Sequence, residues 1–351
     1  MAELRKVRGP LDEEQLEWLT RIYGPVDGKY RSRDYVRHQF VDNPFGWSAH
    51  VFAVDAGEPV GHCGVVPFAA RLGDKAVTVG KLEALAVDPS HRGRRGDGSS
   101  LATDILTTLY AFAVATGLPL LFGLAPPAVA RIHVRAGCRQ LPLAAPAYVH
   151  VTSRRTFAGQ GHSRKRRVAA VVLSQTQRLV LEAAYGLARL CAGAKAEPRL
   201  EWPGDQDAEI VAARSNPGSW TISGTDAWDW FAGSGTLRAL ELGGRFGSRA
   251  LLRIDESDAT TVQIVAWRPA RVGLVPAILL LGAAARIARV RSAPTLRFQP
   301  WQGTGGDGSL ARACRLLGFV ERPEADLLVY ASDESFPSAS PALTPFFYVT
   351  F

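Results

Sequence analysis

Hydrophobic and polar positions along residues 1–152 follow two periods, which predict a mixed sheet covered by helices. Alternating or continuous apolar runs indicate strands, and apolar residues at three- and four-residue spacing indicate helices. Turn signals at Gly57-Glu58 and Gly73-Asp74 join neighbouring strands as hairpins. The expected strands are 4–7, 50–54, 60–72, 77–87, 118–124 and 148–152, and the expected helices are 11–23, 33–41, 99–116 and 127–136.

The second half of the chain repeats this order of elements weakly. Its expected strands are 237–242, 248–254, 261–267, 295–298, 327–330 and 346–351, and its expected helices are 226–231, 272–290 and 310–317. A polar, basic, glycine-rich linker at 159–167, a helix at 168–191 and a loop at 192–207 lie between the halves. The pattern predicts an α/β fold of the mixed α+β type, with an N-terminal domain at 1–156, a linker and connecting helix at 157–200, and a C-terminal domain at 201–351.

The segment 81–100, KLEALAVDPSHRGRRGDGSS, is expected to be a strand, a basic glycine-rich turn and the start of a helix at Ser99. Backbone N–H groups at a helix N-terminus bind anions, and glycines let the backbone approach a phosphate closely. The basic residues Lys81, Arg92, Arg94 and Arg95 favour a pyrophosphate. The spacing matches neither a nucleoside triphosphate loop nor a dinucleotide fingerprint. A solvated basic turn without a ligand is the alternative.

This segment resembles the acyl-CoA loop of the GNAT superfamily of N-acyltransferases, in which Val-x-Pro is followed by Arg-Gly and by G-x-G opening a long helix. The loop here is one residue longer than the family's R-G-x-G-x-G and contains the acidic Asp97. The resemblance extends to the order of elements over about 150 residues. It implies that the backbone of Leu85, Ala86 and Val87 pairs with the pantetheine arm. It also implies that the loop binds CoA, through Arg92, Gly93, Arg94, Arg95, Gly96, Asp97, Gly98 and Ser99.

The second half resembles a degenerate GNAT-like domain. The segment 268–274, RPARVGL, stands where a CoA loop would lie, and it has one glycine and no basic G-x-G. Together with the DNPFGW stretch at 42–47 and the LTPFFY ending at 343–348, the halves resemble the tandem GNAT proteins of bacterial polysaccharide and natural-product clusters. The resemblance implies one acyl-CoA, acetyl or longer, per chain and transfer to a primary amine of a small molecule, sugar or peptide in a ternary complex.

Glu83 is the candidate base for deprotonating the attacking amine. It lies in the expected strand 77–87, and GNAT enzymes often have an acidic residue on this strand facing the amine. Because side chains alternate along a strand, Glu83, Leu85 and Val87 are expected to share one face. The alternative is a solvent-facing glutamate paired with Lys81.

His133 is the candidate acid for the departing thiolate. The family's short helix carries Tyr-x-x-x-Gly with its tyrosine near the CoA sulfur, and His133 lies four residues before Gly137. A histidine has a pKa nearer neutrality than a tyrosine has. The family's asparagine, seven or eight residues earlier, is here Ala125 or Pro126. A structural histidine at a helix–strand interface is the alternative.

Aromatic residues of the second half are candidates for an acceptor or acyl pocket between the halves: Trp228, Trp230, Phe346, Phe347 and Tyr348. A hydrophobic domain interface is the alternative. In related tandem acetyltransferases of mycobacteria a C-terminal carboxylate serves as base, so the carboxylate of Phe351 is a further candidate.

Composition narrows the function classes. The 41 basic and 33 acidic residues give a net charge of +8, which suits CoA, an acidic acyl carrier protein or a nucleic acid. The basic residues are dispersed and no nucleic-acid motif is visible, so a ribosome- or tRNA-associated protein is the weakest hypothesis. The four cysteines match no zinc spacing, which predicts free thiols in a reducing cytoplasm and no metal.

The N-terminus has no signal-peptide core, and the apolar run 272–285, which contains Pro276, is too short to span a bilayer. The sequence therefore predicts a cytoplasmic N-acyltransferase. A non-catalytic acyl-CoA-binding or scaffold protein is the alternative, because the loop is lengthened and the asparagine is missing.

Overall fold

The structure is a computed structural model of the 351-residue chain. It describes residues 2–25, 32–72, 75–93, 100–141, 147–152, 164–193, 198–207, 220–222, 228–233, 237–243, 246–254, 261–268, 273–293, 295–298, 308–322, 326–332 and 342–343.

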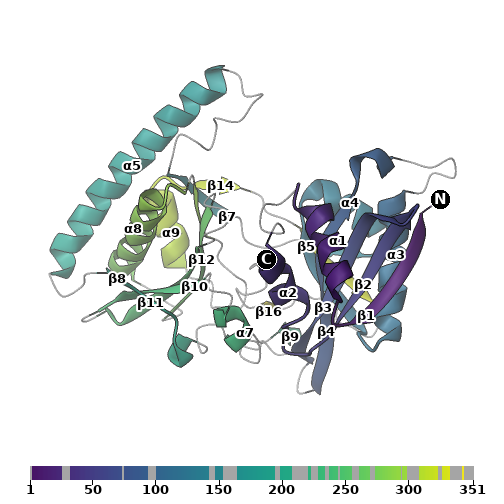
Figure 1. Ribbon diagram of the computed structural model, residues 1–351. Coiled ribbons are helices and arrows are strands. Elements are labelled where there is room, and N and C mark those ends of the chain that lie inside the picture. Colours follow the sequence, from purple (N-terminus) through teal and green to yellow (C-terminus); the bar gives the residue numbers. More distant parts are fainter. Residues whose placement is uncertain are drawn as a thin grey trace.

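The first sheet begins as an antiparallel meander and continues through a parallel strand (Figure 1). It is covered on one face by α1 (Glu13–Tyr23) and α2 (Arg33–Phe40), and on the other by α3 (Leu101–Ala115) and α4 (Pro127–Arg135). In spatial order its strands are β1 (Glu3–Gly9), β2 (Ser48–Asp55), β3 (Glu58–Leu72), β4 (Lys75–Val87), β5 (Leu120–Ala125), β15 (Asp326–Ala331) and β6 (Arg139–Leu141), with β9 (Trp220–Ile222) on β3 and β16 (Ala342–Leu343) on β9.

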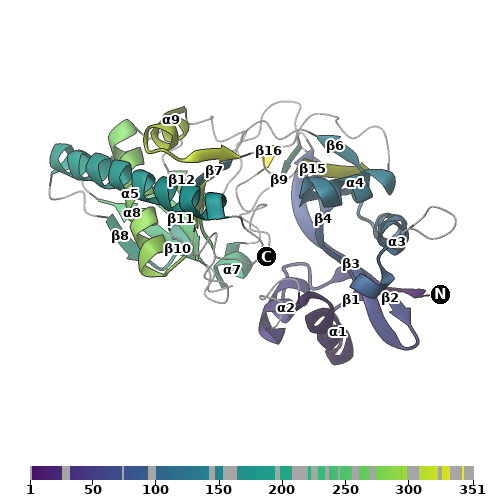
Figure 2. The ribbon, with the colours of Figure 1, turned by 90° about the horizontal axis from the view of Figure 1, so that it is seen from above.

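The second sheet is covered on its outer face by α5 (Arg164–Ala192), α8 (Leu274–Val290) and α9 (Gly308–Leu316), as Figures 1 and 2 show. Tyr185 of α5 lies against Gly282 of α8, where a Cβ would collide with the tyrosine ring. The strands, in spatial order, are β14 (Val320–Arg322), β7 (Ala147–Val151), β13 (Thr295–Phe298), β12 (Thr261–Arg268), β11 (Ser248–Ile254), β10 (Leu237–Leu242) and β8 (Pro198–Glu201).

Each half of the chain contributes to the sheet of the other half: the first half supplies β7 to the second sheet, and the second half supplies β15, β9 and β16 to the first. β7, expected as the last strand of the first half, lies between β13 and β14 in the second sheet. β15, from the second half, lies between β5 and β6 in the first sheet. The domain boundaries expected from sequence remain a prediction, but the two sheets are not built from separate stretches of chain.

A continuous hydrophobic core joins the halves beneath α2 and α7 (Trp228–Gly233). Trp230 is 7% exposed, its ring lies 5.9 Å from that of Phe68, and its Nε1–H donates a hydrogen bond to the carbonyl of His38. Leu237 and Leu251 of the second sheet belong to the same core. The mixed α/β architecture with two helix-covered sheets agrees with the fold class predicted from the sequence.

Local signals account for the helix starts. Asp12 and Gln15 form a reciprocal capping box on α1, and the Ser100 hydroxyl accepts a hydrogen bond from the Thr103 amide at the start of α3.

Two sequence predictions for the segment between the two halves of the chain were wrong. The linker 159–167 gives way to α5 at Arg164, and the loop 192–207 contains β8 and a 3₁₀ turn, Asp205–Asp207.

Candidate functional site

A cavity opens where β4 and β5 part. Their parallel pairing is confined to Gly80 with Leu121 and Lys81 with Phe122, and the strands then diverge toward their C-terminal ends. The cavity has a volume of about 200 Å³. Its walls come from β4, β5, α4 with the preceding Pro126, the exchanged strand β15 and one residue of β3: Cys63, Leu82, Glu83, Ala84, Leu85, Gly123, Leu124, Ala125, Pro126, Val129, His133 and Leu328.

Gly123 sets the separation of the strands at the base of the cavity. A Cβ on this glycine would lie 2.9 Å from Cβ of Leu82, closer than side chains tolerate. Any other residue would push β4 and β5 apart next to their last pair, Lys81 and Phe122. The width of the cavity therefore depends on a glycine at this position.

A β-bulge at Ala84 reorients β4 at the cavity. Cys63 of β3 pairs with Leu85 and Gly64 pairs with Glu83, so Ala84 is the extra residue, and its φ is +47°. Non-glycine residues rarely adopt this conformation, and such strain gathers at functional sites. The expectation that Glu83 shares a face with Leu85 and Val87 was therefore wrong. Leu85 and Val87 pack with Leu82 on the α3 face, and Glu83 points to the opposite face.

Glu83 forms a buried ion pair with Lys81, two residues earlier on the same face of β4. Both side chains are 4% exposed. The pairing matches the alternative considered for Glu83, but the pair is buried instead of facing solvent, and Glu83 lines the cavity. Burial lowers the pKa of Lys81, the carboxylate of Glu83 opposes that effect, and Arg253 of β11 adds to it. Lys81 thus belongs to this pair rather than to the basic turn, and the second sheet places a positive charge near it.

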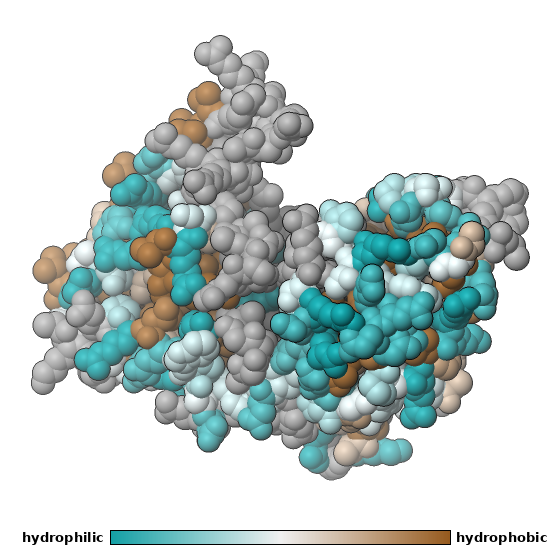
Figure 3. Space-filling view, viewed as in Figure 1, coloured by the Kyte–Doolittle hydropathy of each residue, from teal (hydrophilic) through white to brown (hydrophobic). Residues whose placement is uncertain are grey.

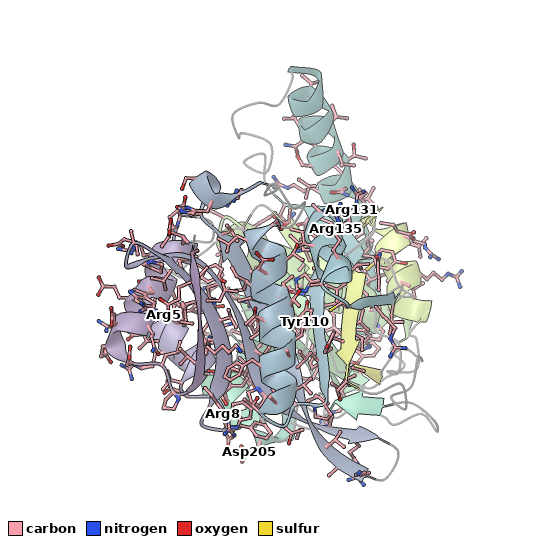
Figure 4. All side chains as sticks on the ribbon, turned by 90° about the vertical axis from the view of Figure 1, so that its right-hand side faces the viewer. Arg5, Arg8, Tyr110, Arg131, Arg135 and Asp205 are labelled. Atoms are coloured by element: carbon pink, nitrogen blue, oxygen red, sulfur yellow. The ribbon has the colours of Figure 1, made fainter. Side chains whose placement is uncertain are left out.

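His133 is 5% exposed and is another of the residues that line the cavity. Its Nδ1 lies 2.6 Å from the hydroxyl of Tyr110, and the thiol of Cys138 donates to that hydroxyl over 3.2 Å. Tyr110 projects from α3, as Figure 4 shows. Burial lowers the pKa of His133 to about 4, so the imidazole is neutral at pH 7. The sequence prediction of an acid titrating near neutrality does not fit this environment.

The order of donors in this chain favours one tautomer of His133. The Cys138 thiol donates to the Tyr110 oxygen, so the Tyr110 hydroxyl is free to donate its own proton to His133 Nδ1. A neutral imidazole that accepts at Nδ1 carries its proton on Nε2. His133 can then offer an N–H donor within the cavity. Sequence reasoning missed Tyr110 and Cys138 because nothing in their spacing signals this contact.

A second buried chain of hydrogen bonds supports the bulge from the α1 side. The Tyr23 hydroxyl lies 2.9 Å from the carbonyl of Ala84 and 2.9 Å from His62 Nδ1. His62 Nε2 lies 2.9 Å from His50 Nδ1, and His50 Nε2 lies 2.6 Å from the Ser48 hydroxyl. Burial lowers the pKa of His50 to about 3 and that of His62 well below its usual value, so both are neutral. These residues hold the strained backbone beside Glu83.

The expected cofactor residues divide into described and undescribed parts. Leu85 is half-buried, Ala86 and Val87 are buried, and all three extend beyond the last pairing of β4 with β5. Arg92 Nε donates a hydrogen bond to the carbonyl of Val87, which ties the turn to the strand. Gly93 follows it, and the remaining loop residues lie outside the described part of the chain: Arg94, Arg95, Gly96, Asp97, Gly98 and Ser99.

The aromatic candidates do not meet at this cavity. Trp228 and Trp230 belong to the core that joins the halves, as the interface alternative holds. Phe346, Phe347, Tyr348 and Phe351 lie outside the described residues.

The four cysteines are free thiols. Within the described ranges, no group of three or more His, Cys, Asp or Glu side chains is arranged to hold a metal ion. None of the helices described is long and apolar enough to cross a membrane.

Comparison with known proteins agrees with the geometry. Residues 13–122 match the model of the acetyltransferase (GNAT) family. No curated protein sequence matches the chain.

Solved structures share the fold at low sequence identity. A tandem GNAT protein from the clavulanic acid biosynthesis pathway aligns with a TM-score of 0.59 and 12% identity, covering 95% of this chain and 100% of that one. The N-myristoyltransferase of Saccharomyces cerevisiae with bound myristoyl-CoA aligns with a TM-score of 0.57 and 9% identity over 94% and 79% of the two chains. A probable N-acyltransferase from Enterococcus faecalis aligns with a TM-score of 0.53 and 11% identity over 95% and 73%.

Proposed function

This chain carries a GNAT acetyltransferase domain, and we propose that it transfers an acyl group from an acyl-CoA to the primary amine of a small molecule, sugar or peptide. One observation supports this most: Glu83 and His133 line the same cavity at the point where β4 and β5 part. The diverging strands leave room for an extended thioester arm beside the backbone of Leu85, Ala86 and Val87. That arm pairs with the strand edge as an added strand would.

The reaction forms a C–N bond and breaks a C–S bond. The amine attacks the thioester carbonyl and loses a proton to the Glu83 carboxylate, directly or through water. A backbone N–H of the bulged strand stabilises the developing oxyanion. The CoA thiolate leaves, and the neutral His133 donates a hydrogen bond from Nε2 to its sulfur.

Filling the cavity tests the proposal. Val129 lies at the start of α4 and is only partly buried, so Val129→Trp is expected to block the cavity with little effect on folding. We expect one CoA bound per wild-type chain and amine-dependent thiol release from acetyl-CoA or a longer acyl-CoA, and loss of both in the variant. Calorimetry and a thiol-release assay with a panel of amino sugars, peptides and aliphatic amines measure the two effects.

Val134→Trp is the matched control, because Val134 is on the same helix but 42% exposed and outside the cavity. Its binding and thiol release should equal those of the wild type. CoA binding without thiol release on any amine would favour the non-catalytic acyl-CoA-binding alternative. Two CoA molecules per chain would contradict a degenerate second half.

Tyr110→Phe tests the hydrogen-bond chain behind His133. Without the Tyr110 hydroxyl, Nδ1 loses its donor and the imidazole is no longer held with its proton on Nε2. We expect kcat to fall about fivefold, in line with the roughly 1 kcal/mol typical of one hydrogen bond, with KM for acyl-CoA unchanged. Steady-state kinetics measure the two constants.

Cys138→Ala keeps the contact between Tyr110 and His133, so kcat should fall less in this variant than in Tyr110→Phe.

The pKa of His133 predicts the pH dependence of the reaction. Because this pKa is about 4, His133 becomes protonated, and its Nδ1 stops accepting the Tyr110 hydrogen bond, only as the pH falls toward 4. The pH–rate profile between pH 6 and 9 should therefore not depend on His133. A limb between pH 6 and 9 that disappears in His133→Phe would contradict the assigned neutral donor.

A further inference from the structure

The long helix α5 exposes a broad apolar face on the outer flank of the second half. Large apolar side chains on it are strongly exposed: Val168 (57%), Val172 (59%), Leu179 (71%), Leu187 (64%) and Leu190 (83%). Monomeric soluble proteins rarely leave so much contiguous apolar surface in water. Hydrophobic atoms are visible along this flank in the space-filling view (Figure 3).

The exposed apolar residues share one side of the helix. At about 100° per residue, Val168, Val172, Leu179 and Leu190 fall within about 40° of one another, and Leu187 widens the same face. The buried residues Leu181, Tyr185 and Ala188 project roughly opposite, into the core formed with α8. α5 therefore has two apolar faces, of which the fold covers one.

The charge of α5 favours an anionic surface as the occupant of the uncovered face. Its sequence holds six basic residues and one acid, Glu182, and begins with Arg-Lys-Arg-Arg. Glu182 is already paired with Arg286 and Arg289 of α8. Two copies packed through this helix would bring like charges together, whereas anionic lipid would attract them.

We propose that α5 binds the surface of an anionic phospholipid membrane, lying in the interface with its exposed apolar face among the acyl chains. A helix with an exposed apolar face and many Lys and Arg residues is the kind that binds such surfaces. Figures 1 and 2 both place α5 at the opposite end of the molecule from β4 and β5, the strands that line the cavity, so membrane binding leaves that cavity accessible. The proposal does not depend on the proposed acyl transfer.

Co-sedimentation with vesicles tests the proposal. The full chain should bind vesicles of phosphatidylcholine with phosphatidylserine, bind phosphatidylcholine vesicles at least tenfold more weakly, and lose affinity as salt increases. The double variant Leu179→Ser/Leu190→Ser should lose at least tenfold in binding to the anionic vesicles. Both leucines are exposed, so its thermal unfolding midpoint should match the wild type.

Leu316→Ser is the control, because Leu316 is 54% exposed but lies on α9. It should bind as the wild type does. Equal binding of the double variant and the wild type, or equal binding to neutral and anionic vesicles, would overturn the proposal. So would a stable dimer in light scattering that Leu179→Ser/Leu190→Ser dissociates, or binding to RNA without binding to vesicles.

Discussion

Replacing Glu83 by glutamine is expected to lower the turnover number roughly 10²–10⁴-fold, the range that general acid–base catalysis supplies. Glutamine keeps the shape of the side chain but cannot accept a proton from the attacking amine. The affinity for CoA should barely change, because the backbone of β4 and the basic turn bind CoA in the proposed function. Turnover on the acceptor found in the amine panel and calorimetry with CoA measure the two quantities.

The buried pair with Lys81 requires a stability control. Removing one partner of a buried ion pair typically costs about 3–5 kcal/mol, so Glu83→Gln should also lower the free energy of unfolding. The double variant Lys81→Met/Glu83→Gln removes both charges and should regain most of that stability. If catalysis needs the Glu83 carboxylate, the double variant stays inactive although it is stable.

Lys81→Met gives a pH test of the same pair. The Lys81 ammonium favours the ionised form of its neighbour, and without it a buried carboxylate takes up a proton more readily. The acid limb of the pH–rate profile should therefore move to higher pH in Lys81→Met.

Wild-type turnover in Glu83→Gln would mean that another group is the base. The C-terminal carboxylate of Phe351 would be tested next by deleting that residue.

A fragment ending at residue 156 is expected not to fold into a stable unit, although a domain boundary at 156 is what the sequence predicts. The fragment lacks β15, whose Leu327, Leu328 and Val329 are at most 3% exposed between the cores on the two faces of the first sheet. It also leaves β7 without β13 and β14, its partners in the second sheet. An apolar strand edge without its neighbour is prone to aggregate.

Expression of residues 1–156 alone should therefore give insoluble protein or a chain without a cooperative thermal transition. Co-expression with residues 157–351 is the control, because the exchanged strands can pair between fragments, and it should restore a soluble complex. A monomeric, cooperatively unfolding 1–156 fragment would contradict this expectation and support the boundaries predicted from sequence.

The hairpins, the main helices and the candidate residues could be predicted because their signals are local. Alternating apolar residues predict β3 and β4. Pro127 and Gly137 mark the two ends of α4, and this places His133 on the helix that lines the cavity. The bulge could not be predicted, because alanine carries no signal for a φ of +47°. Without the bulge, strand alternation wrongly places Glu83 on the same face as Leu85 and Val87.

The exchange of β7 and β15 also lacks a local signal. Both strands are short and mostly apolar, and neither sequence carries a turn or spacing signal that specifies which sheet it joins. Which sheet they join depends on tertiary packing, such as the contact of Leu327 with the core beneath α1 and α2. The chain Cys138–Tyr110–His133 likewise arises only when α3 and α4 pack together.

Strand exchange has a consequence for synthesis on the ribosome. Translation proceeds from the N-terminus, and β15 begins at Asp326, so β5 emerges long before the strand that covers its edge. At about 5–20 residues per second, the stretch between β7 and β15 takes on the order of ten to forty seconds to translate. Through that interval the nascent first sheet presents an open apolar edge, which is the kind of surface that chaperones bind. We therefore expect the yield of folded protein in cells to depend more on the supply of chaperones than on the stability of the finished protein.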